Sequence, residues 1–568
     1  MKASLFRFGA VAIAMQAMSA AADTQVLYVS GQGASESPYG SWQTAARSVA
    51  EALDAVNGEA VINVAPGVYE IDEEIIVSKP NITIQSCDAE GKLAREQTVF
   101  DGGYPERFPK SVSNRLFKVS ANNVTFKGLT LQNAFYRASG NTDGGAGIYV
   151  GNVSGLTVDT CTITNCCVGN GCGGGILFTQ AVIGKSYLIT NTIVHSCVAS
   201  GYGGGLSKTY GNGKDESSND KNDWLVIDAC TFVGNKRIND GIFTPSSSLS
   251  NGGAHFGNVP VYVKNSLIAG GSGPQLLNTD ADAVFDNCTF SSFPNTKWAF
   301  NTGGHYNTRS FVHCVLKDTY LRSPSLVDFN CCVFSNITYS GQTGGAPNKV
   351  FEGGSVKNSL WIHNQQPIVA KSTIFENCSI VSNYVGGIVM ALAGEKATFK
   401  NCVIAGNKNY YQDISVSSYG GASFNYRNGW KNGAASSLTL INCYIEGADK
   451  ISVYQYAGIG VDKAVYPSGS TAPILAFDTT GASDRIFERA RQAGPGFVDA
   501  ENGDWHLSRK SPLRDAGLND AWMANATDLD GRPRLLRPNG KYSASATVDL
   551  GCYECDLPIS EGLRLFLR

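Results

Sequence analysis

Short apolar runs of two to five residues recur from about residue 72 to residue 470 of this chain, separated by turn-forming residues. One unit contains a run such as Ala397-Thr-Phe399, then Asn401, then a small residue, then a second run such as Val403-Ile404. No helical pattern lies between the runs, which excludes an array of alternating strands and helices. The pattern therefore predicts short strands joined by frequent tight turns.

A recurrent phrase marks each unit. In this phrase Asn or Asp stands next to, or one residue from, a small residue, and hydrophobic residues follow. Copies lie roughly 18 to 41 residues apart, and the separations cluster in the twenties. A fixed phrase at variable spacing indicates one structural unit whose loops differ in length. The copies begin at Asp159, Asn191, Asp228, Asn265, Asn287, Asn330, Asn358, Asn377, Asn401 and Asn442, with His313-Cys314 as a variant.

These features favour an all-β fold, a single-stranded right-handed parallel β-helix (a solenoid) over residues 81–493. Its rungs stack about 4.8 Å apart and leave no free edge except at the two ends. Several copies end in Asn, as at Asn235, Asn383 and Asn407. Asn tolerates left-handed turn geometry, and its amide bonds to the amides above and below it. Asparagine ladders are therefore expected.

Residues 23–80 are expected to form an N-terminal cap and the first coil. Val26–Val29 has the pattern of a first strand, and Ser41 then precedes an amphipathic helix that ends just before Gly58. A solenoid needs a polar-faced lid on its open end, and this helix suits that role. The apolar positions of the predicted helix are Trp42, Ala45, Ala46, Val49, Leu53 and Val56.

The first residues have the organisation of a secretory signal peptide, assigned to 1–22. Lys2 and Arg7 precede an apolar segment, 8–18, and small residues up to Ala22 form the cleavage zone. No other stretch reaches the roughly 18 apolar residues needed to span a membrane. The chain is therefore expected to be exported, with no transmembrane helix.

Composition narrows the classes of partner. The 568 residues include 64 Gly, are 43% hydrophobic and only 16% charged, and carry a formal net charge of −3. The Gly content suits many tight turns. No block of like charges is present, so no nucleic-acid partner is expected.

The 16 cysteines of an exported chain would ordinarily suggest disulfides. Seven of them share one position of the phrase, and Thr192, Ser266 and Ser359 occupy the same position. A position that accepts Cys, Ser or Thr wants a small buried side chain, and stacked positions about 4.8 Å apart are too distant for Cβ atoms that bridge near 3.8 Å. A ladder of free thiols is expected at Cys161, Cys230, Cys288, Cys314, Cys378, Cys402 and Cys443, and bridges are expected among Cys166, Cys167, Cys172, Cys197 and the pair Cys552 and Cys555.

Two resemblances add to this interpretation. Glycine runs of the type Gly-Gly-Ala/Gly-Ile/Leu, for example at Gly144, Gly173 and Gly203, alternate with Phe/Ile-x-x-Asn over about 120–440. This alternation resembles the repeats of polymorphic outer-membrane proteins, which implies a pectin-lyase-like β-helix and the role of a surface adhesin.

The segment 494–556 resembles the choice-of-anchor Q domain, which closes many secreted bacterial β-helix proteins. The resemblance rests on Gly494-Pro-Gly-Phe-Val-Asp499, Asp504-Trp-His-Leu507, Ser511-Pro-Leu-Arg-Asp-Ala-Gly517, Asp528-Leu-Asp-Gly-Arg-Pro-Arg534 and Val548-Asp-Leu-Gly-Cys-Tyr-Glu554. Cys552 departs from the Ala usual in that family. The resemblance implies a C-terminal cap followed by a sorting or docking tail, 557–568, for which a frayed end is the alternative.

Two clusters of aromatic and polar residues are candidate substrate-binding sites. Aromatic faces beside hydrogen-bonding groups suit sugars, because a ring packs on C–H faces while polar groups bond the hydroxyls. Ordinary packing of these side chains in turns is the alternative. The first cluster contains Trp298, His305, Tyr306 and Arg309, and the second contains Tyr410, Tyr411, Tyr426 and Trp430.

The remaining polar groups point to no cofactor and no metal. A polysaccharide lyase needs a base and a cation at the developing charge, but Arg137, Arg237, Arg322 and Arg427 are widely spaced, and no catalytic residue is assigned. The loop 207–223 is rich in acids and amides, yet it lacks the spacing of a calcium loop and is expected to be a solvated insertion. An ion-pair network is expected among Asp515, Asp528, Asp530, Asp549, Arg514, Arg532 and Arg534.

The sequence as a whole favours a secreted protein at the cell surface or outside the cell, attached to the outer envelope through its tail. Its expected partner is a polysaccharide or cell-surface glycan, bound in the manner of an adhesin. A polysaccharide-degrading lyase or glycoside hydrolase is the alternative, and a purely structural envelope component is a third. Whether the protein is an enzyme stays open at this point.

Overall fold

The computed structural model of this chain describes most of the predicted coil and the segment that follows it. The predicted signal peptide, 1–22, and the tail, 557–568, lie outside the described residues. The described ranges are 24–106, 113–140, 143–179, 186–208, 225–237, 254–255, 261–270, 277–279, 283–291, 300–302, 309–319, 327–337, 351–365, 368, 370–384, 388–389, 396–407, 414–416, 437–445, 452–453, 475–478, 494–536 and 543–555.

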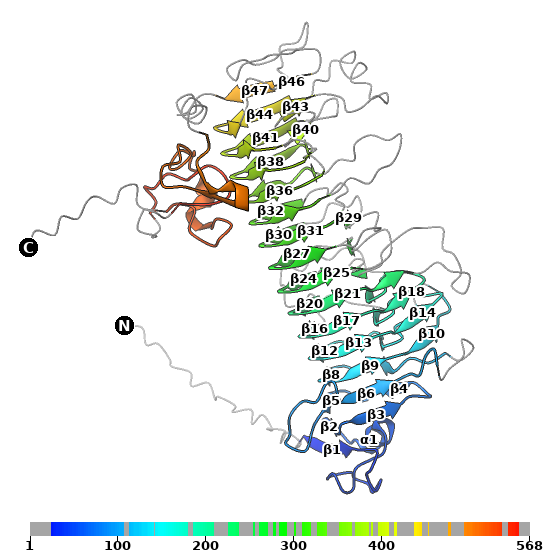
Figure 1. Cartoon of the computed structure of the whole chain (residues 1–568). Coiled ribbons are helices and arrows are strands. Elements are labelled where there is room, and N and C mark those ends of the chain that lie inside the picture. The colour runs from blue at the N-terminus through cyan, green and yellow to red at the C-terminus, as the bar shows by residue number, and fades with distance from the viewer. Residues whose placement is uncertain are drawn as a thin grey trace, which may run out of the picture.

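The chain winds through three long sheets in turn, and all strand pairings within these sheets are parallel. Figure 1 shows the rungs stacked one above another along one axis. Sheet A has 16 strands. They are β1 (Gln25–Val29), β2 (Ala60–Val64), β5 (Ile82–Ser86), β8 (Val124–Lys127), β12 (Leu156–Asp159), β16 (Tyr187–Thr190), β20 (Leu225–Asp228), β24 (Val261–Lys264), β27 (Ala283–Asp286), β30 (Arg309–Val312), β32 (Val327–Asn330), β35 (Ser355–Lys357), β38 (Thr373–Glu376), β41 (Lys396–Lys400), β44 (Ser437–Ile441) and β47 (Leu475–Asp478).

Sheet B follows sheet A in each coil and has 14 strands, while sheet C has 8. Sheet B contains β3 (Gly67–Glu70), β6 (Thr98–Asp101), β9 (Thr130–Gln132), β13 (Thr162–Thr164), β17 (Ile193–His195), β21 (Thr231–Val233), β25 (Leu267–Ala269), β28 (Thr289–Ser291), β31 (Val315–Lys317), β33 (Val333–Ser335), β36 (Leu360–Ile362), β39 (Ser379–Val381), β42 (Val403–Ala405) and β45 (Tyr444–Ile445). Sheet C contains β4 (Ile75–Val77), β7 (Phe117–Val119), β11 (Ile148–Val150), β15 (Ile176–Phe178), β19 (Leu206–Lys208), β23 (Ala254–His255), β26 (Leu277–Thr279) and β29 (Phe300–Thr302).

Three small parallel sheets complete the coils. The first joins β10 (Phe135–Arg137), β14 (Cys167–Gly169), β18 (Val198–Ala199) and β22 (Lys236–Arg237). The second pairs β34 (Phe351–Glu352) with β37 (Ala370–Lys371), and the third joins β40 (Ile388–Val389), β43 (Ile414–Val416) and β46 (Ser452–Val453). The predicted all-β solenoid is confirmed: the protein is a parallel β-helix.

The core is the interior of the coil. In most sheet A strands the first and third residues point inward and the second and fourth point outward, which is the period of a half-buried strand. In-register stacking lines up like side chains. The ring centroids of Phe285 and Phe311 lie 4.6 Å apart, those of Phe311 and Phe329 lie 4.9 Å apart, and those of Phe375 and Phe399 lie 4.4 Å apart. Burial of these columns is the main force that holds the rungs together.

The N-terminal lid contains the expected helix, but its predicted start was wrong. Helix α1 spans Val49–Ala55 and begins after Ser48, whose side chain accepts a hydrogen bond from the backbone amide of Glu51. Of the residues that we placed in its first two turns, 42–44 form a tight turn instead, and Ala46 pairs with Val29 at the edge of β1. Covering that edge satisfies backbone groups that a longer helix would leave unpaired.

Residues 494–536 and 543–555 form a compact unit, here called the C-terminal unit. It contains the antiparallel pair β48 (Phe497–Asp499) and β49 (Asp504–Leu507) and the 3-10 helices η3 (Ala500–Asn502) and η4 (Ala521–Asn525). Figure 1 shows it in orange and red beside the coils near β32 to β38, whereas we expected a cap over the end of the coil. Within the described ranges, no helix combines the length and the apolar character that crossing a membrane requires.

Candidate functional site

The turn between sheets A and B, here called the first turn, has one residue in the left-handed region. Its φ lies between 49° and 54° from Thr160 to Asn442. Six of these residues lie in the open, and we call them the open ladder; the five that follow are buried, and we call them the covered ladder. The open ladder is Thr160, Asn191, Ala229, Asn265, Asn287 and His313, and the covered ladder is Cys331, Asn358, Asn377, Asn401 and Asn442.

Side-chain hydrogen bonds join several successive rungs of both ladders. The asparagine ladder that we predicted lies elsewhere, at the turn after sheet B, where Asn383 Nδ2 donates to Asn407 Oδ1 at 2.7 Å. The left-handed residues there are not the predicted asparagines but the residues before them, Gly234, Ser382 and Gly406. In the open ladder, Asn265 Nδ2 donates to Asp228 Oδ1 at 2.9 Å, and Asn287 Nδ2 donates to Asn265 Oδ1 at 2.8 Å. In the covered ladder, Asn442 Nδ2 donates to Asn401 Oδ1 at 2.9 Å. At Thr160, Ala229 and Cys331, which have no side-chain amide, the preceding residue supplies the acceptor: Asp159, Asp228 and Asn330.

The residue after each left-handed turn residue points inward, and the structure explains why Cys, Ser and Thr exchange there. Each of these side chains donates to the carbonyl of the residue two positions earlier, as Cys402 Sγ does to Lys400 O at 3.3 Å and Ser266 Oγ to Lys264 O at 2.7 Å. The position therefore needs a small donor and not only a small side chain. These buried residues are Cys161, Thr192, Cys230, Ser266, Cys288, Cys314, Cys332, Ser359, Cys378, Cys402 and Cys443.

All 16 cysteines are free, so the expected thiol ladder is confirmed and the expected bridges are wrong. Cys166 and Cys197 belong to a second ladder, at the turn after sheet B. Asn165 and Ser196 precede them with φ of 51° and 55°, and both thiols donate to backbone carbonyls, at 3.4 Å to Thr164 O and His195 O. Asn235, Asn364, Asn383 and Asn407 hold the same position in other coils and donate to the preceding rung.

The C-terminal unit binds the covered ladder through side-chain N–H groups of the ladder asparagines that point outward from the coil. Asn401 Nδ2 donates to Leu518 O at 2.9 Å, and Asn401 Oδ1 accepts from Leu518 N at 2.8 Å. Asn377 Nδ2 donates to Asp549 O at 3.2 Å and Asn442 Nδ2 to Ala516 O at 2.9 Å. The ladder side chains thus face outward as hydrogen-bonding groups of a docking surface.

Apolar and ionic contacts complete this interface. Most outward side chains of sheet B beside the covered ladder are apolar and pack against the C-terminal unit, while Ser379 Oγ accepts a hydrogen bond from Cys552 N at 3.1 Å. The Lys400 ammonium pairs with Asp520 at 2.9 Å. This contact and a short hydrogen bond to Ala521 lower the pKa of Asp520. The packed residues are Leu360, Ile362, Val381, Val403, Ala405 and Tyr444 from the coil, with Trp505, Leu507, Leu513 and Leu550 from the unit.

The corresponding face beside the open ladder is more polar and is partly exposed. Outward residues of sheet B alternate there between hydroxyl-bearing and apolar, as in Thr162, Ile193, Thr231 and Leu267. The lysines of the adjacent sheet A column pair with their neighbours: Lys264 Nζ lies 3.0 Å from Asp228, and Lys127 Nζ lies 3.7 Å from Asp159. Burial opposes ionisation of Asp228, but hydrogen bonds from Asn265 and Lys264 outweigh it and lower its pKa.

A second group of charged residues lies near sheet C. The Arg115 guanidinium lies over the Tyr136 ring at 3.6 Å and donates to Gly144 O at 2.7 Å, to Glu74 at 3.2 Å and to Asp143. Burial opposes ionisation of Asp143, but bonds from the Ser139 amide and from Arg115 outweigh it and lower its pKa. Lys118 Nζ lies 4.0 Å from Glu74 and is 38% exposed. The cluster gathers a cation and carboxylates, and the guanidinium is fully engaged in holding its neighbours.

The C-terminal unit contains part of the expected ion-pair network, including Arg514 with Asp515 at 3.6 Å, and it adds three residues that sequence reasoning missed. Arg534 pairs with buried Glu554 at 3.1 Å, and Arg532 pairs with Asp530 at 3.3 Å. His506 lies between two carboxylates, with Nδ1 at 2.6 Å from Asp504 and Nε2 at 2.7 Å from Asp530. The three missed residues, Asp504, His506 and Glu554, lie within the motifs of the anchor-like segment, which was the available signal.

Of the predicted sugar-binding residues, the structure describes only Arg309. It lies in β30 at an inward position and is 1% exposed, in register with Ala283 and Val327. It is therefore inside the coil and not on an outer loop. The prediction that the two aromatic clusters bind sugar stays a prediction, because Trp298, His305, Tyr306, Tyr410, Tyr411, Tyr426 and Trp430 lie outside the described residues.

The predicted loop 207–223 begins inside the coil. Ser207 and Lys208 are buried in β19, and burial lowers the pKa of Lys208 to about 7. Residues 209–223 lie outside the described residues. No group of three His, Cys, Asp or Glu side chains that could hold a metal occurs among the residues that the structure describes.

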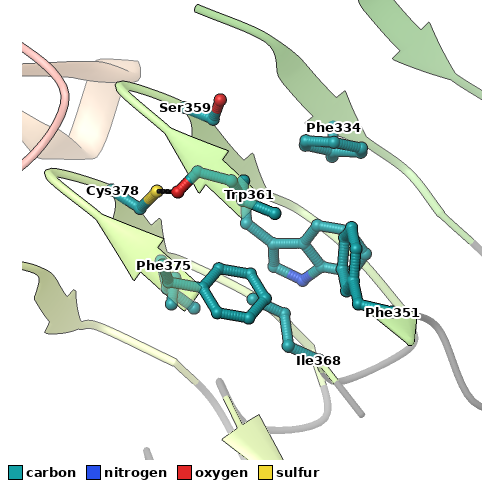
Figure 2. A pocket seen from close by; sticks show the side chains of 9 residues that line it. Phe334, Phe351, Ser359, Trp361, Ile368, Phe375 and Cys378 are labelled. Carbon is teal, nitrogen blue, oxygen red and sulfur yellow. Dashed lines mark hydrogen bonds between the residues drawn. The ribbon is translucent and has the colours of Figure 1, made fainter. Parts of the chain in front are cut away.

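A small cavity lies inside the coil between β33 and β39. Figure 2 shows the Trp361 indole among Phe334, Phe351, Phe375 and Ile368. Its volume of about 10 Å³ is at the lower limit for one water, and its lining is almost wholly apolar. It is a packing gap and far too small for a sugar ring.

Comparisons with known proteins add little to this description. No family model and no curated protein matches the chain. The solved structures that are similar to the chain include two polysaccharide lyases. A pectate lyase, Pel9A, is 16% identical with a TM-score of 0.30, over 94% of this chain and 96% of that chain. A rhamnogalacturonan lyase is 13% identical with a TM-score of 0.30, over 66% of this chain and 87% of that chain. At these values neither carries an argument about activity, and the β-helix assignment rests on the strand pairing above.

Proposed function

We propose that this protein is an exported, surface-attached β-helix that binds polysaccharide and does not cleave it. The observation that carries the proposal is the ladder of the first turn. One half of it already serves as a docking surface inside the molecule, and the other half presents the same kind of side chains to solvent. Export and surface attachment rest on the predicted signal peptide and on the anchor-like motifs of residues 494–556.

The arrangement of charged groups also supports binding without cleavage. Among the described residues, the guanidinium of Arg115 and the ammonium groups of Lys127 and Lys264 are paired with carboxylates. A lyase needs a base and a cation that meet the substrate at one place. Paired cations along an open face instead give a surface of low net charge that suits recognition of hydroxyl groups.

A panel of polysaccharides tests the proposal. The mature chain is expected to be retained by at least one immobilised polysaccharide while no reducing or unsaturated ends appear in the solution. Accumulation of either product would contradict the proposal, and so would failure to bind every polysaccharide of the panel.

A polysaccharide-degrading enzyme is the second candidate, and the cluster around Arg115 is the observation that favours it. Lys118 is its most exposed cation and lies close to Glu74. If the panel gives products, the variants Lys118→Met and Glu74→Gln separate the two functions. Loss of product with binding retained would assign the chemistry to this cluster, whereas unchanged product formation would place the chemistry elsewhere.

A further inference from the structure

The covered ladder shows which acceptor its amides bind. A side-chain amide has two N–H groups. At Asn401 and at Asn442, one bond runs along the ladder and a second runs outward to a backbone carbonyl of the C-terminal unit. The outward partners are Leu518 O and Ala516 O, both uncharged oxygens. The ladder therefore presents donors to neutral acceptors that lie one rung apart.

The open ladder has the same geometry, and no residue in the described part of the chain forms a layer over it. Asn191, Asn265 and Asn287 share the left-handed φ of their covered counterparts, and each makes the bond along the ladder through Nδ2. All three are exposed. Their second N–H groups point away from the coil, toward the side on which the covered ladder holds its partner.

We infer that the open ladder, together with the outward face of sheet B beside it, binds a neutral, hydroxyl-rich polysaccharide extended along the axis of the coil. This inference rests on the proposed function and names its site and ligand class. Rungs recur about every 4.8 Å, which is comparable to the length of one sugar ring in an extended chain. Each rung can then serve one ring.

The outward face of sheet B distinguishes a glycan from a protein partner. Beside the covered ladder this face is mainly apolar, with Leu360, Val381 and Val403 packed against the C-terminal unit and Ser379 as its one described hydroxyl in that contact. A stable protein interface has such an apolar core. Beside the open ladder, Thr162 and Thr231 alternate with Ile193 and Leu267. Alternating hydroxyl and aliphatic groups match the hydroxyls and C–H faces of sugars.

Charge distinguishes a neutral glycan from an acidic one. The carboxylates of this face are Asp159, Asp228 and Asp286, and two of its described ammonium groups, Lys127 and Lys264, are paired with the first two. Asp286 Oδ1 lies 3.3 Å from His313 Nδ1. A third described ammonium group, Lys317, is exposed on the outward face of β31. Three carboxylates thus stand against three lysines, and a face without excess positive charge favours a neutral glycan over a uronic acid.

The test uses the mature full-length chain with three probes: a neutral mannan, a neutral β-glucan and polygalacturonate. The triple variant Asn191→Gly/Asn265→Gly/Asn287→Gly removes the amides and keeps a residue that favours the left-handed turn. Binding to a neutral probe is expected to weaken about tenfold or more, since three donors are lost. The control variants Asn165→Gly and Asn336→Gly make the same change at the second turn, and binding is expected to stay within about twofold of the parent.

The outcomes separate the inference from the proposed function. If no probe is retained by the parent chain, the proposed function fails and the inference fails with it. If the parent binds and the triple variant binds equally well, or if polygalacturonate is preferred, the inference alone is overturned. Self-association of the parent that the triple variant loses would show that a second copy occupies the face, and would also overturn it.

Thermal unfolding of the triple variant checks that the coil is intact, and the single variant Asn265→Gly covers the case in which the triple variant does not fold. Its binding is expected to weaken by about two- to threefold, and unchanged binding would count against the inference.

Discussion

The open and covered ladders have the same backbone and different surroundings. Both have a left-handed residue followed by a buried donor, and both bond from rung to rung. What differs is the outward side of sheet B, which is apolar beside Asn401 and mixed beside Asn265. The repeat therefore sets the architecture, and the residues around it decide whether a protein layer covers the ladder.

The largest effect on stability is expected from destabilising the C-terminal unit, which covers the covered ladder. Arg534 is the buried cation opposite Glu554, and its Nη2 also donates to Asp549 O at 3.1 Å. Arg534→Met leaves buried carboxylates without their cation, which costs about 3–5 kcal/mol. The C-terminal unit is expected to become protease-sensitive while the N-terminal coils stay resistant.

Exposed Lys510 offers the control, since Lys510→Met changes a charge of the same unit at its surface. In the Arg534 variant, uncovering Leu360, Val381 and Val403 is expected to increase binding of a hydrophobic dye. A fully protease-resistant C-terminal unit in that variant would contradict the prediction.

The next effect compares the two ladders directly. Asn401 bonds to Asn377, Asn442 and Leu518, whereas Asn265 bonds only along the ladder among the described contacts. Gly at either position keeps the turn. Asn401→Gly is expected to lower the free energy of unfolding by about 2 kcal/mol and Asn265→Gly by about 0.5 kcal/mol, measured by denaturant titration. Equal losses of unfolding free energy in the two variants would show that the hydrogen bonds between Asn401 and the C-terminal unit do not stabilise the protein.

A smaller effect, equal in both halves, is expected at the inward donor position. Cys230 lies behind the open ladder and Cys402 behind the covered one, and both thiols donate to carbonyls of their own turns, at 3.2 Å and 3.3 Å. Replacement by Ala removes the donor and is expected to cost about 1 kcal/mol in each case, whereas Ser keeps it at a smaller cost. The measurement is the unfolding midpoint of the four variants. A Ser variant as unstable as the Ala variant would refute the requirement for a donor.

The smallest effect is the pH dependence of stability, which is expected only in the C-terminal unit. Burial opposes charging of His506, but the carboxylates of Asp530 and Asp504 outweigh it and raise its pKa. Burial raises the pKa of Asp549 to about 6. A raised folded-state pKa adds stability that is full below the unfolded pKa and is lost as the pH rises through the folded pKa.

The C-terminal unit is therefore expected to be more stable near pH 5.5 than near pH 8, by less than about 1 kcal/mol from the half-exposed histidine. Hydrogen exchange at the two pH values, corrected for the intrinsic rate, measures the difference. His506→Gln is expected to reduce it, and a unit more stable at pH 8 would contradict the assignment.

Much of the coil was predictable because its signal is local. A turn residue that takes positive φ, followed by a small donor, occupies two adjacent positions, and these positions recur at each described turn from sheet A to sheet B between β12 and β45. The second ladder had the same signal in Asn165-Cys166 and Ser196-Cys197, which our disulfide expectation overlooked. The start of α1 was missed because Ala46 pairs with the edge of β1, a contact that helical periodicity does not reveal.

The candidate site was less predictable. The sequence directed attention to clusters of aromatic and polar residues, and the one member that the structure describes, Arg309, lies inside the coil. The ladder was recognised as architecture, but its outward donors were not recognised as a binding surface. That role becomes visible only where a second segment occupies them.

The sequence by itself determined the parallel coil, the free thiols of the first turn and the asparagine ladder, because each depends on residues adjacent in the chain and repeated from rung to rung. Only the tertiary structure decided which half of the ladder is covered. That outcome depends on contacts between distant segments, such as Asn401 with Leu518, 117 residues apart, and Cys331 with Asp528, 197 residues apart. Such contacts follow from the matching of two surfaces, and no local pattern encodes them.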